Sequence, residues 1–264
     1  MEFEEDGDGK MGFETLMILN CTGKKCKFLE KFYSSLRVGT SQAFEVNRRI
    51  VLASRSIGVG HQGLVKFAGT MNMNPPMNEN SYRDNVDAVR KAAQTVCQQS
   101  MRAAAEDVKK FYEPEEEGVF DIGISEGGTW SRRGYSSMYG IVTAMSTVSG
   151  KAIDIEVMSK ECKECTVWRN KEGTPQFEDW WEGHQHLCQA NHLGSSGSMY
   201  ASGLLAIFQH SVEQYTMRYA EFLGEGDSKA HKLIVEEAVY GEKQISKLEC
   251  VGHVQKCLVH TFAH

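Results

Sequence analysis

The amino-acid sequence predicts an α/β protein with a helical N-terminal region, a β-rich second part and a Cys/His-rich insertion. Three observations carry this prediction. Apolar residues recur every three or four positions before Pro114, β-branched runs begin after Gly118, and a dense group of Cys and His follows those runs. With 264 residues, the chain is long enough to bury a substantial core.

Helical spacing dominates the first part of the chain, so we expect residues 17–115 to be mainly helical. Apolar side chains over residues 86–111 recur at steps of three or four, which is typical of one buried helix face. Pro75–Pro76 cannot lie inside a helix and therefore separates two helical stretches. Pro114 and the acidic run after it mark the expected domain boundary.

After this boundary the sequence pattern changes from helical to strand-like. Three short β-rich runs are separated by turn residues: residues 119–124, 139–144 and 152–158. They predict an antiparallel meander, and a helix over residues 201–215 and a strand over residues 219–223 come later. Three strands, a helix and a fourth strand is the order in which an RNase H-like fold begins, so we expect a partial RNase H-like core over residues 118–264.

Cysteine and histidine gather over about residues 159–195 at the spacing of a metal site. The predicted ligands form two short-spaced pairs: Cys162 with Cys165, and His184 with Cys188. Zinc prefers four tetrahedral thiolate and imidazole ligands, so these pairs predict a closed, structural Zn²⁺ site. His186 and His192 are alternative ligands, and ordinary core cysteines with surface histidines are the alternative interpretation.

Charge and cysteine content bear on partners and compartment. The net charge of −6 argues against coating nucleic acid by bulk electrostatics, but two local basic patches, Lys24-Lys25-x-Lys27 and Arg132-Arg133, can supply phosphate contacts. Each patch can also be a solvated face. Residues 1–16 are expected to form a disordered acidic tail. Eight cysteines without a secretion signal predict a reducing intracellular compartment, nuclear or cytoplasmic, and no apolar run is long enough for a membrane span.

A set of ordered motifs covers nearly the whole chain. In chain order they are FEVNRR at 44–49, GVG at 58–60, MNPPM at 73–77, GTW at 128–130, RGYSSMYG at 133–140, NHLGSSG at 191–197, GDSK at 226–229 and CVGHVQK at 250–256. Together with the Cys162/Cys165 pair, this set resembles the Mutator-like DNA transposase domain of animal mobile elements and their host-captured relatives. The resemblance extends from about residue 21 to residue 256.

The resemblance implies a cut-and-paste transposase built on an RNase H-like fold. In such enzymes Asp, Asp and Glu hold two divalent cations, Mg²⁺ or Mn²⁺, during phosphodiester cleavage and strand transfer. The implied partner is DNA at the element ends, and a homo-oligomer is compatible with the resemblance. No membrane partner is implied.

The first carboxylate of the family pattern is missing from this sequence. It directly precedes the Gly-Thr-Trp motif, where this chain has Gly127, and glycine offers no ligand. The neighbouring Glu126 points to the opposite face of a strand, because successive strand residues alternate. Only a bulge or register change would turn Glu126 toward the site.

The remaining carboxylates are also altered. Glu225 stands where the family has the second Asp, and Asp227 matches the family and is the alternative second-strand ligand. The third carboxylate would follow the Cys250/His253 pair, and no candidate for it occurs before the last residue. We therefore expect a core that is truncated at its C-terminal end.

Three functions are compatible with these observations. The first is a Mutator-like transposase, or a fragment of one, whose cleavage activity is impaired or absent. The second is a host-captured DNA-binding or protein-interaction module that keeps the scaffold without the chemistry. The third is a zinc-stabilised α/β protein that shares only the fold.

Overall fold

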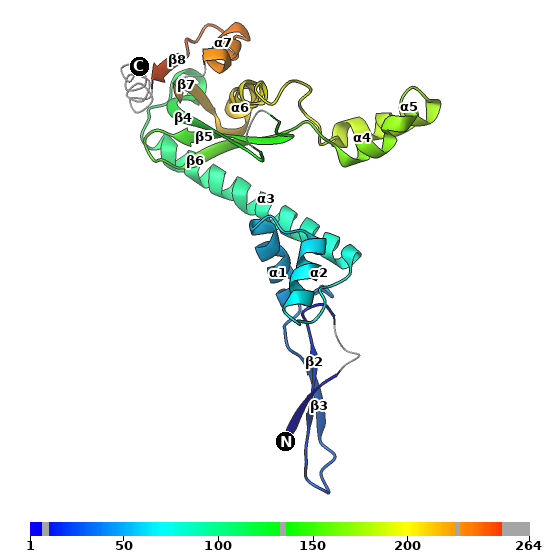
Figure 1. Ribbon diagram of the computed structural model, residues 1–264. Coiled ribbons are helices and arrows are strands. Elements are labelled where there is room, and N and C mark those ends of the chain that lie inside the picture. Colours follow the sequence, from blue (N-terminus) through cyan, green and yellow to red (C-terminus); the bar gives the residue numbers. More distant parts are fainter. Residues whose placement is uncertain (7–10, 133–135, 225–227, 250–264) are drawn as a thin grey trace, which may run out of the picture. The chain divides into compact units, whose positions relative to one another are not determined.

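The structure is a computed structural model that describes residues 1–6, 11–132, 136–224 and 228–249 (Figure 1). It comprises two compact units, Met1–Cys97 and Gln98–His264. Helix α3 (Glu79–Lys109) runs through this division, whereas the sequence placed the boundary near Pro114. Near its start α3 buries Tyr82, and near its end it buries Ala104, Ala105 and Val108, but residues 90–100 between them are exposed except for the half-buried Cys97. The single buried face expected from the apolar spacing is therefore interrupted, and Val96 on it is 64% exposed.

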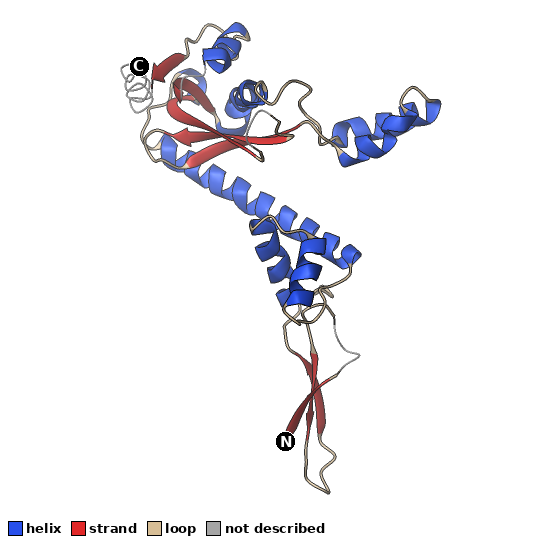
Figure 2. Ribbon diagram, in the orientation of Figure 1, coloured by secondary structure: helices blue, strands red, loops and turns tan. Residues whose placement is uncertain are grey.

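A three-stranded antiparallel sheet opens the first unit (Figure 2): β1 (Glu2–Glu5), β2 (Leu16–Asn20) and β3 (Leu29–Tyr33). This differs from the expected disordered tail and from the expected helical start at residue 17. The reason is that β2, with the sequence LMILN, lies between β1 and β3 and pairs with the backbones of both. Phe3 also contacts the ring of Phe32 edge-on, with centroids 6.5 Å apart, which an acidic composition does not predict.

Helices complete the first unit, where the apolar spacing predicted them. Helix α1 (Glu45–Ser56) and helix α2 (His61–Thr70) precede the N-terminal part of α3, and the Pro75–Pro76 break lies between α2 and α3. One small core contains a residue of each helix, Val51, Leu64 and Tyr82, together with Met77 from the segment between α2 and α3. Each helix therefore buries one face, as its sequence pattern requires.

A mixed five-stranded sheet forms the centre of the second unit. Its strands are β4 (Phe120–Trp130), β5 (Tyr139–Ser146), β6 (Ala152–Ser159), β7 (Met217–Gly224) and β8 (Ser246–Glu249). The order across the sheet is β6-β5-β4-β7-β8. The pairs β4–β5 and β5–β6 are antiparallel, which confirms the predicted meander, and β7 pairs parallel with both β4 and β8.

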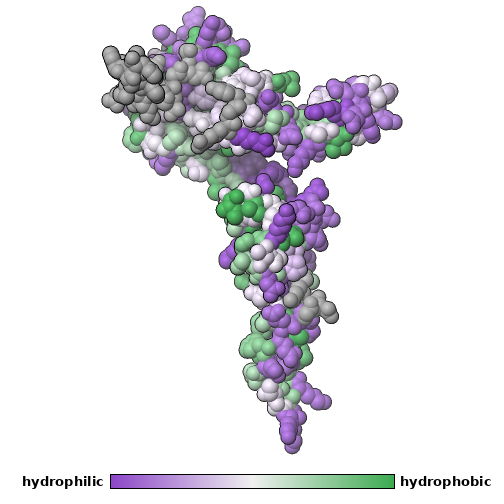
Figure 3. All heavy atoms as spheres, in the orientation of Figure 1, coloured by the Kyte–Doolittle hydropathy of each residue, from purple (hydrophilic) through white to green (hydrophobic). Residues whose placement is uncertain are grey.

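The remaining helices all belong to the second unit. They are η1 (Glu116–Gly118), α4 (Lys163–Trp168), η2 (Arg169–Lys171), α5 (Pro175–His184), η3 (Gln185–Leu187), α6 (Met199–Tyr215) and α7 (Ser228–Glu236). Helices α4 and α5 lie in the insertion between β6 and α6, and α6 carries the chain back to β7 (Figure 1). On the face seen in Figure 3, most of the surface over α4 and α5 is hydrophilic. Within the described part of the chain, no helix is both long and apolar enough to cross a membrane.

Helix α6 packs closely on one face of this sheet. A Cβ at Gly203 would lie 2.7 Å from Val142 of β5 and 3.1 Å from Met158 of β6, so only glycine permits this approach. Alternate residues of β5 are buried toward this face, which is the pattern of a half-buried strand. Many large side chains of the core of this unit come from α6, β4 and β7: Leu204, Ile207, Phe208, Ile122, Ile124, Tyr219 and Phe222.

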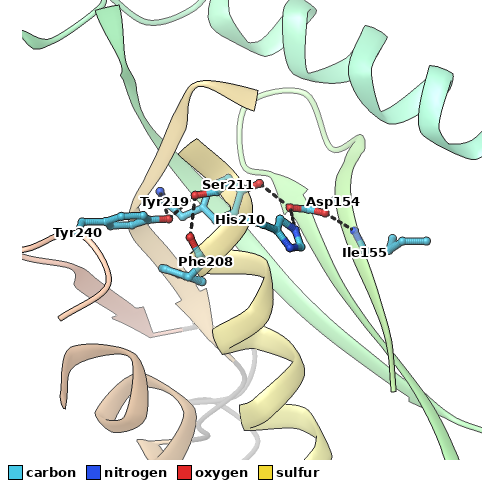
Figure 4. A network of polar contacts seen from close by, with 7 residues as sticks. All are labelled: Asp154, Ile155, Phe208, His210, Ser211, Tyr219 and Tyr240. Atoms are coloured by element: carbon cyan, nitrogen blue, oxygen red, sulfur yellow. Dashed lines mark hydrogen bonds and ion pairs between the residues drawn. The ribbon is translucent and has the colours of Figure 1, made fainter. Parts of the chain in front are cut away.

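A polar network crosses this apolar core (Figure 4). Asp154 of β6 is 2% exposed, and its Oδ2 accepts hydrogen bonds from His210 Nε2 at 2.9 Å and from the Tyr219 hydroxyl at 3.2 Å. The Tyr240 hydroxyl, 2.7 Å from Ser211 Oγ, accepts a hydrogen bond from the backbone N–H of Tyr219. The buried carboxylate is thus compensated by neighbouring donors from α6 and β7.

The pKa of His210 is raised above its ordinary value. Burial acts to lower this pKa, but the hydrogen bond to Asp154 and the negative charges of Asp154, Glu156 and Glu213 outweigh burial. Protonated His210 therefore stabilises the folded state. This contribution is complete below the unfolded-state pKa of about 6.5 and is lost as pH rises through the higher folded-state pKa.

We expect the free energy of unfolding to fall as pH rises above about 6.5, because His210 then loses its proton. Urea denaturation of the wild type and of His210→Gln across this range measures the effect. The variant should lack this component of the pH dependence, whereas a control variant of an exposed histidine, His186→Gln, should keep it. Equal pH profiles for the wild type and His210→Gln would contradict the assignment.

Candidate functional site

The insertion between β6 and α6 leaves and rejoins the sheet at one point. Ser159 N donates to Asn191 Oδ1 at 2.7 Å, and Asn191 N donates to the Ser159 carbonyl at 2.9 Å. Asn191 Nδ2 also donates to the carbonyl of Val157 at 2.8 Å. These bonds hold the two ends of the insertion together at the sheet, so residues 160–190 form a separate loop with a closed base.

Four side chains of this insertion converge on one point. Their ligand atoms all lie within 4.8 Å of one another: Cys162, Cys165, His184 and Cys188. His184 Nε2 is 3.4 Å from the sulfur of Cys162 and 3.3 Å from that of Cys165, and the sulfurs of Cys165 and Cys188 are 3.4 Å apart. This Cys₃His cluster could hold a metal ion such as zinc, for which thiolate and imidazole are preferred ligands.

Local structure explains how these ligands meet. Cys162 lies at the N-terminus of α4 and Cys165 one turn later, so both sulfurs face the same side of the helix. His184 is the last residue of α5, and η3 turns the chain so that Cys188 returns to the cluster. Two short helices thus bring together pairs that are distant in sequence.

The imidazole of His184 is oriented from two sides. Its Nδ1 lies 3.0 Å from a carboxylate oxygen of Glu164, which leaves Nε2 directed at the sulfurs. Its ring stacks on Trp180 with centroids 4.5 Å apart, and Trp180 stacks on Trp168 at 4.9 Å. A carboxylate on the outer nitrogen is a common way to fix a metal-binding histidine.

The pKa values of two cysteines in the cluster, Cys162 and Cys165, are shifted in opposite directions. Burial acts to raise the pKa of Cys162, but backbone N–H groups of Cys165, Gln189 and Glu164 outweigh it and lower that pKa to about 6. Burial raises the pKa of Cys165 to about 12, together with the adjacent sulfurs of Cys188 and Cys162. Neighbouring thiolates repel one another, and a bound cation would relieve that repulsion.

The two alternative histidines lie outside the cluster. His192 is buried, and its Nε2 lies 3.1 Å from the carbonyl oxygen of Ser195 and 3.0 Å from the hydroxyl of Ser198. His186 is exposed on η3. Four protein ligands leave no open position on a tetrahedral ion, so the arrangement suits a structural metal rather than a catalytic one.

A second candidate site lies where β4 and β7 run side by side. Ser125 of β4 pairs with Leu223 of β7, the next-to-last residue of that strand. Gly127 follows on β4 and pairs with Thr143 of β5. A Cβ at Gly127 would lie 3.1 Å from the Thr143 hydroxyl, with no other atom of the described residues within 4 Å.

Glu126 and Gly127 lie on opposite faces of β4. The β4–β5 ladder runs without a register shift from Ile124 to Trp130, so no bulge turns Glu126. Glu126 pairs with Ala144, on the face that α6 covers, and its side chain is only 5% exposed. Its Oε1 lies 2.7 Å from where a Cβ of Gly224 would stand, so the carboxylate abuts the end of β7.

Comparison with protein-family models gives one finding for this chain. A model described as Mutator-like transposase matches residues 1–262. The chain belongs to the Mutator-like transposase family. No curated protein and no solved structure matches it.

Four residues proposed for the transposase site fall outside the described residues. They are Glu225, Asp227, Cys250 and His253. Sequence reasoning about the metal cluster missed Glu164 and the stacked tryptophans. A signal for both was present, because an acidic residue lies between the first two cysteines and aromatic residues are dense just before His184.

We expect the purified transposase domain to carry about one zinc ion per chain. The double variant Cys162→Ser plus Cys165→Ser should lose the ion and the order of the insertion, because few other side chains there are buried. Elemental analysis and circular dichroism measure the two effects. Cys97→Ser, in α3, is the matched control and should retain both the zinc ion and the order of the insertion. A wild type without zinc, or normal folding of the double variant, would contradict the assignment.

Proposed function

We propose that this chain is the core of a cut-and-paste DNA transposase whose two-metal carboxylate centre is impaired. The observation that carries the proposal is Gly127 on β4, two residues beyond Ser125, the last residue of β4 that pairs with β7. By the resemblance, the family has its first carboxylate at this position. The matched family supports a transposase-type function. Zinc in the Cys₃His cluster and DNA as the partner complete the proposal.

The arrangement of the sheet supports an RNase H-like core. Three antiparallel strands are followed by α6 and by β7, which pairs parallel with β4 at the centre of the sheet. Adjacent parallel strands place their carboxyl ends at one edge, where acidic residues from both strands can share metal ions. The order β6-β5-β4-β7-β8 is compatible with that fold.

The proposed chemistry needs hard oxygen ligands from both strands. When two divalent cations are bound, one activates the attacking oxygen and the other stabilises the leaving oxygen. Glu225 and Asp227 directly follow β7 in the sequence and are the proposed ligands from that strand. Gly127 contributes no carboxylate from β4, so the metals would lack a shared side-chain ligand between the strands.

Glu126 is a poor replacement for the missing ligand. It lies on the α6 side of the sheet, whereas a side chain at position 127 would lie on the other side. Reaching that side would require a register change in a ladder that is regular from Ile124 to Trp130. We therefore propose impaired or absent cleavage rather than a shifted carboxylate set.

A host-captured DNA-binding or protein-interaction module is the second candidate. It is favoured by the contrast between an altered ligand position and a scaffold that keeps its core and its Cys₃His cluster. Selection on binding alone would retain those features without the carboxylates. Terminal inverted repeats flanking the genomic locus would favour a mobile element, and stable expression without them would favour the module.

We expect the purified chain not to nick or join DNA in Mg²⁺ or Mn²⁺, because position 127 supplies no ligand. Conversion of supercoiled plasmid to nicked circles measures cleavage. Asp227→Asn, prepared in parallel, controls for contaminating nuclease. Metal-dependent nicking by the wild type that Asp227→Asn abolishes would overturn the proposal.

Restoring the carboxylate should restore metal binding. The space at Gly127 admits a side chain if Thr143 shifts slightly, so we expect Gly127→Asp to bind Mn²⁺ on the order of tenfold more tightly than the wild type. Electron paramagnetic resonance of free Mn²⁺ measures the affinity. Gly127→Asn is the neutral control of the same shape, and equal affinities for the Asp and Asn variants would count against a carboxylate centre at this edge.

A further inference from the structure

We infer that α1, the turn after it and α2 form a helix-turn-helix unit that binds duplex DNA, with α2 as the helix that enters the major groove. The choice of DNA as the partner rests on the proposed function. The geometry of the unit, its exposed side chains and its charge are independent of the carboxylate centre in the other unit.

The turn between the two helices is short and fixed. Four residues separate Ser56 of α1 from His61 of α2, and Gly58 among them has φ of +74°. Gly58 N donates to the carbonyl of Arg55 at 3.1 Å, and Val59 N donates to that of Ser54 at 2.7 Å. These two bonds form a Schellman motif, which ends α1 and requires a left-handed residue where Gly58 stands.

Small residues let the two helices pack closely around this turn. A Cβ at Gly63 would lie 2.8 Å from the side chain of Val59, so α2 begins directly against the turn. Ser54 is buried on α1, and Val51 of α1 shares a core cluster with Leu64 of α2. A pair of packed helices joined by a short glycine-containing turn is the form in which proteins present a recognition helix.

The outer face of α2 carries side chains suited to base edges. Exposed residues recur at helical spacing along one stripe: Gln62, Val65, Lys66, Gly69 and Thr70. An amide, an ammonium and a hydroxyl can hydrogen-bond bases in the major groove, and an aliphatic side chain can contact a thymine methyl group. The sequence of α2, HQGLVKFAGT, contains no acidic residue that would repel phosphates.

Charge around the unit favours a polyanion as the partner. Residues 21–78 contain nine Lys or Arg and two Asp or Glu, a formal charge of +7 in a chain whose total is −6. The basic residues include Arg49 and Arg55 on α1 and the Lys24-Lys25-x-Lys27 patch between β2 and β3. Such residues supply the phosphate contacts that position a recognition helix.

Fluorescence anisotropy of the full chain with labelled duplex DNA, across a salt series, tests this inference. We expect Lys66→Gln to weaken binding about three- to tenfold and to reduce the slope of log affinity against log salt by about 0.9. Arg90→Gln is the matched control, since Arg90 is an exposed residue of α3 in the same unit, paired with Asp87. It removes the same charge and should change affinity less than about twofold.

Selection from a random duplex pool tests base reading by the stripe. Gln62→Ala should relax the sequence preference of the wild type at one position while circular dichroism shows an unchanged fold. Equal effects of Lys66→Gln and Arg90→Gln, or an unchanged preference in Gln62→Ala, would overturn the assignment of α2.

The two proposals fail separately. Binding to DNA through α2, combined with no gain of Mn²⁺ affinity in Gly127→Asp, would support the helix-turn-helix unit and remove the carboxylate centre. A Mn²⁺ response in Gly127→Asp, combined with no duplex binding by the wild type at low salt, would do the reverse.

Discussion

The parallel pairing of β4 with β7 is the constraint on which the second unit depends. Neighbouring parallel strands need a long crossover connection, so everything between β6 and β7 must leave the sheet and return across one face. Helix α6 makes that return, and Gly203 lets it approach β5 and β6 closely. The same pairing ends at Ser125 and Leu223, so Gly127 lies two residues beyond the last residue of β4 that pairs with β7. One residue at that edge can therefore change the chemistry while the packing that supports it stays intact.

Stability and chemistry are separated along β7. The network of Asp154, His210 and Tyr219 contacts the strand near its start, and the proposed carboxylate edge lies at its end. The buried Asp154 is matched by its donors, so the network holds α6 to the sheet independently of any divalent cation. A scaffold arranged in this way would keep its core if a ligand at that edge were lost, as we propose for position 127.

Pattern and spacing predicted those parts of the molecule in which local sequence determines structure. The meander follows from alternating apolar residues, and the four metal-cluster residues follow from paired spacing. The β1–β3 sheet was missed because the pairing of acidic residues 2–5 with β2 depends on a distant partner. The division between the two units falls within α3, because that helix continues from one unit into the other. The role of Asp154 depends on contacts from two other elements, α6 and β7, which no local pattern encodes.

The closed base of the insertion affects how well the chain tolerates changes in the length and sequence of the insertion. Bonds between Ser159 and Asn191 already join its two ends, and a bound ion would join Cys162 to Cys188 as well. For loop-closure entropy, the connection from β6 to α6 then behaves as though it were only a few residues long. Residues 169–174, between α4 and α5, could be lengthened, shortened or replaced by another sequence with little effect on the folding of the sheet.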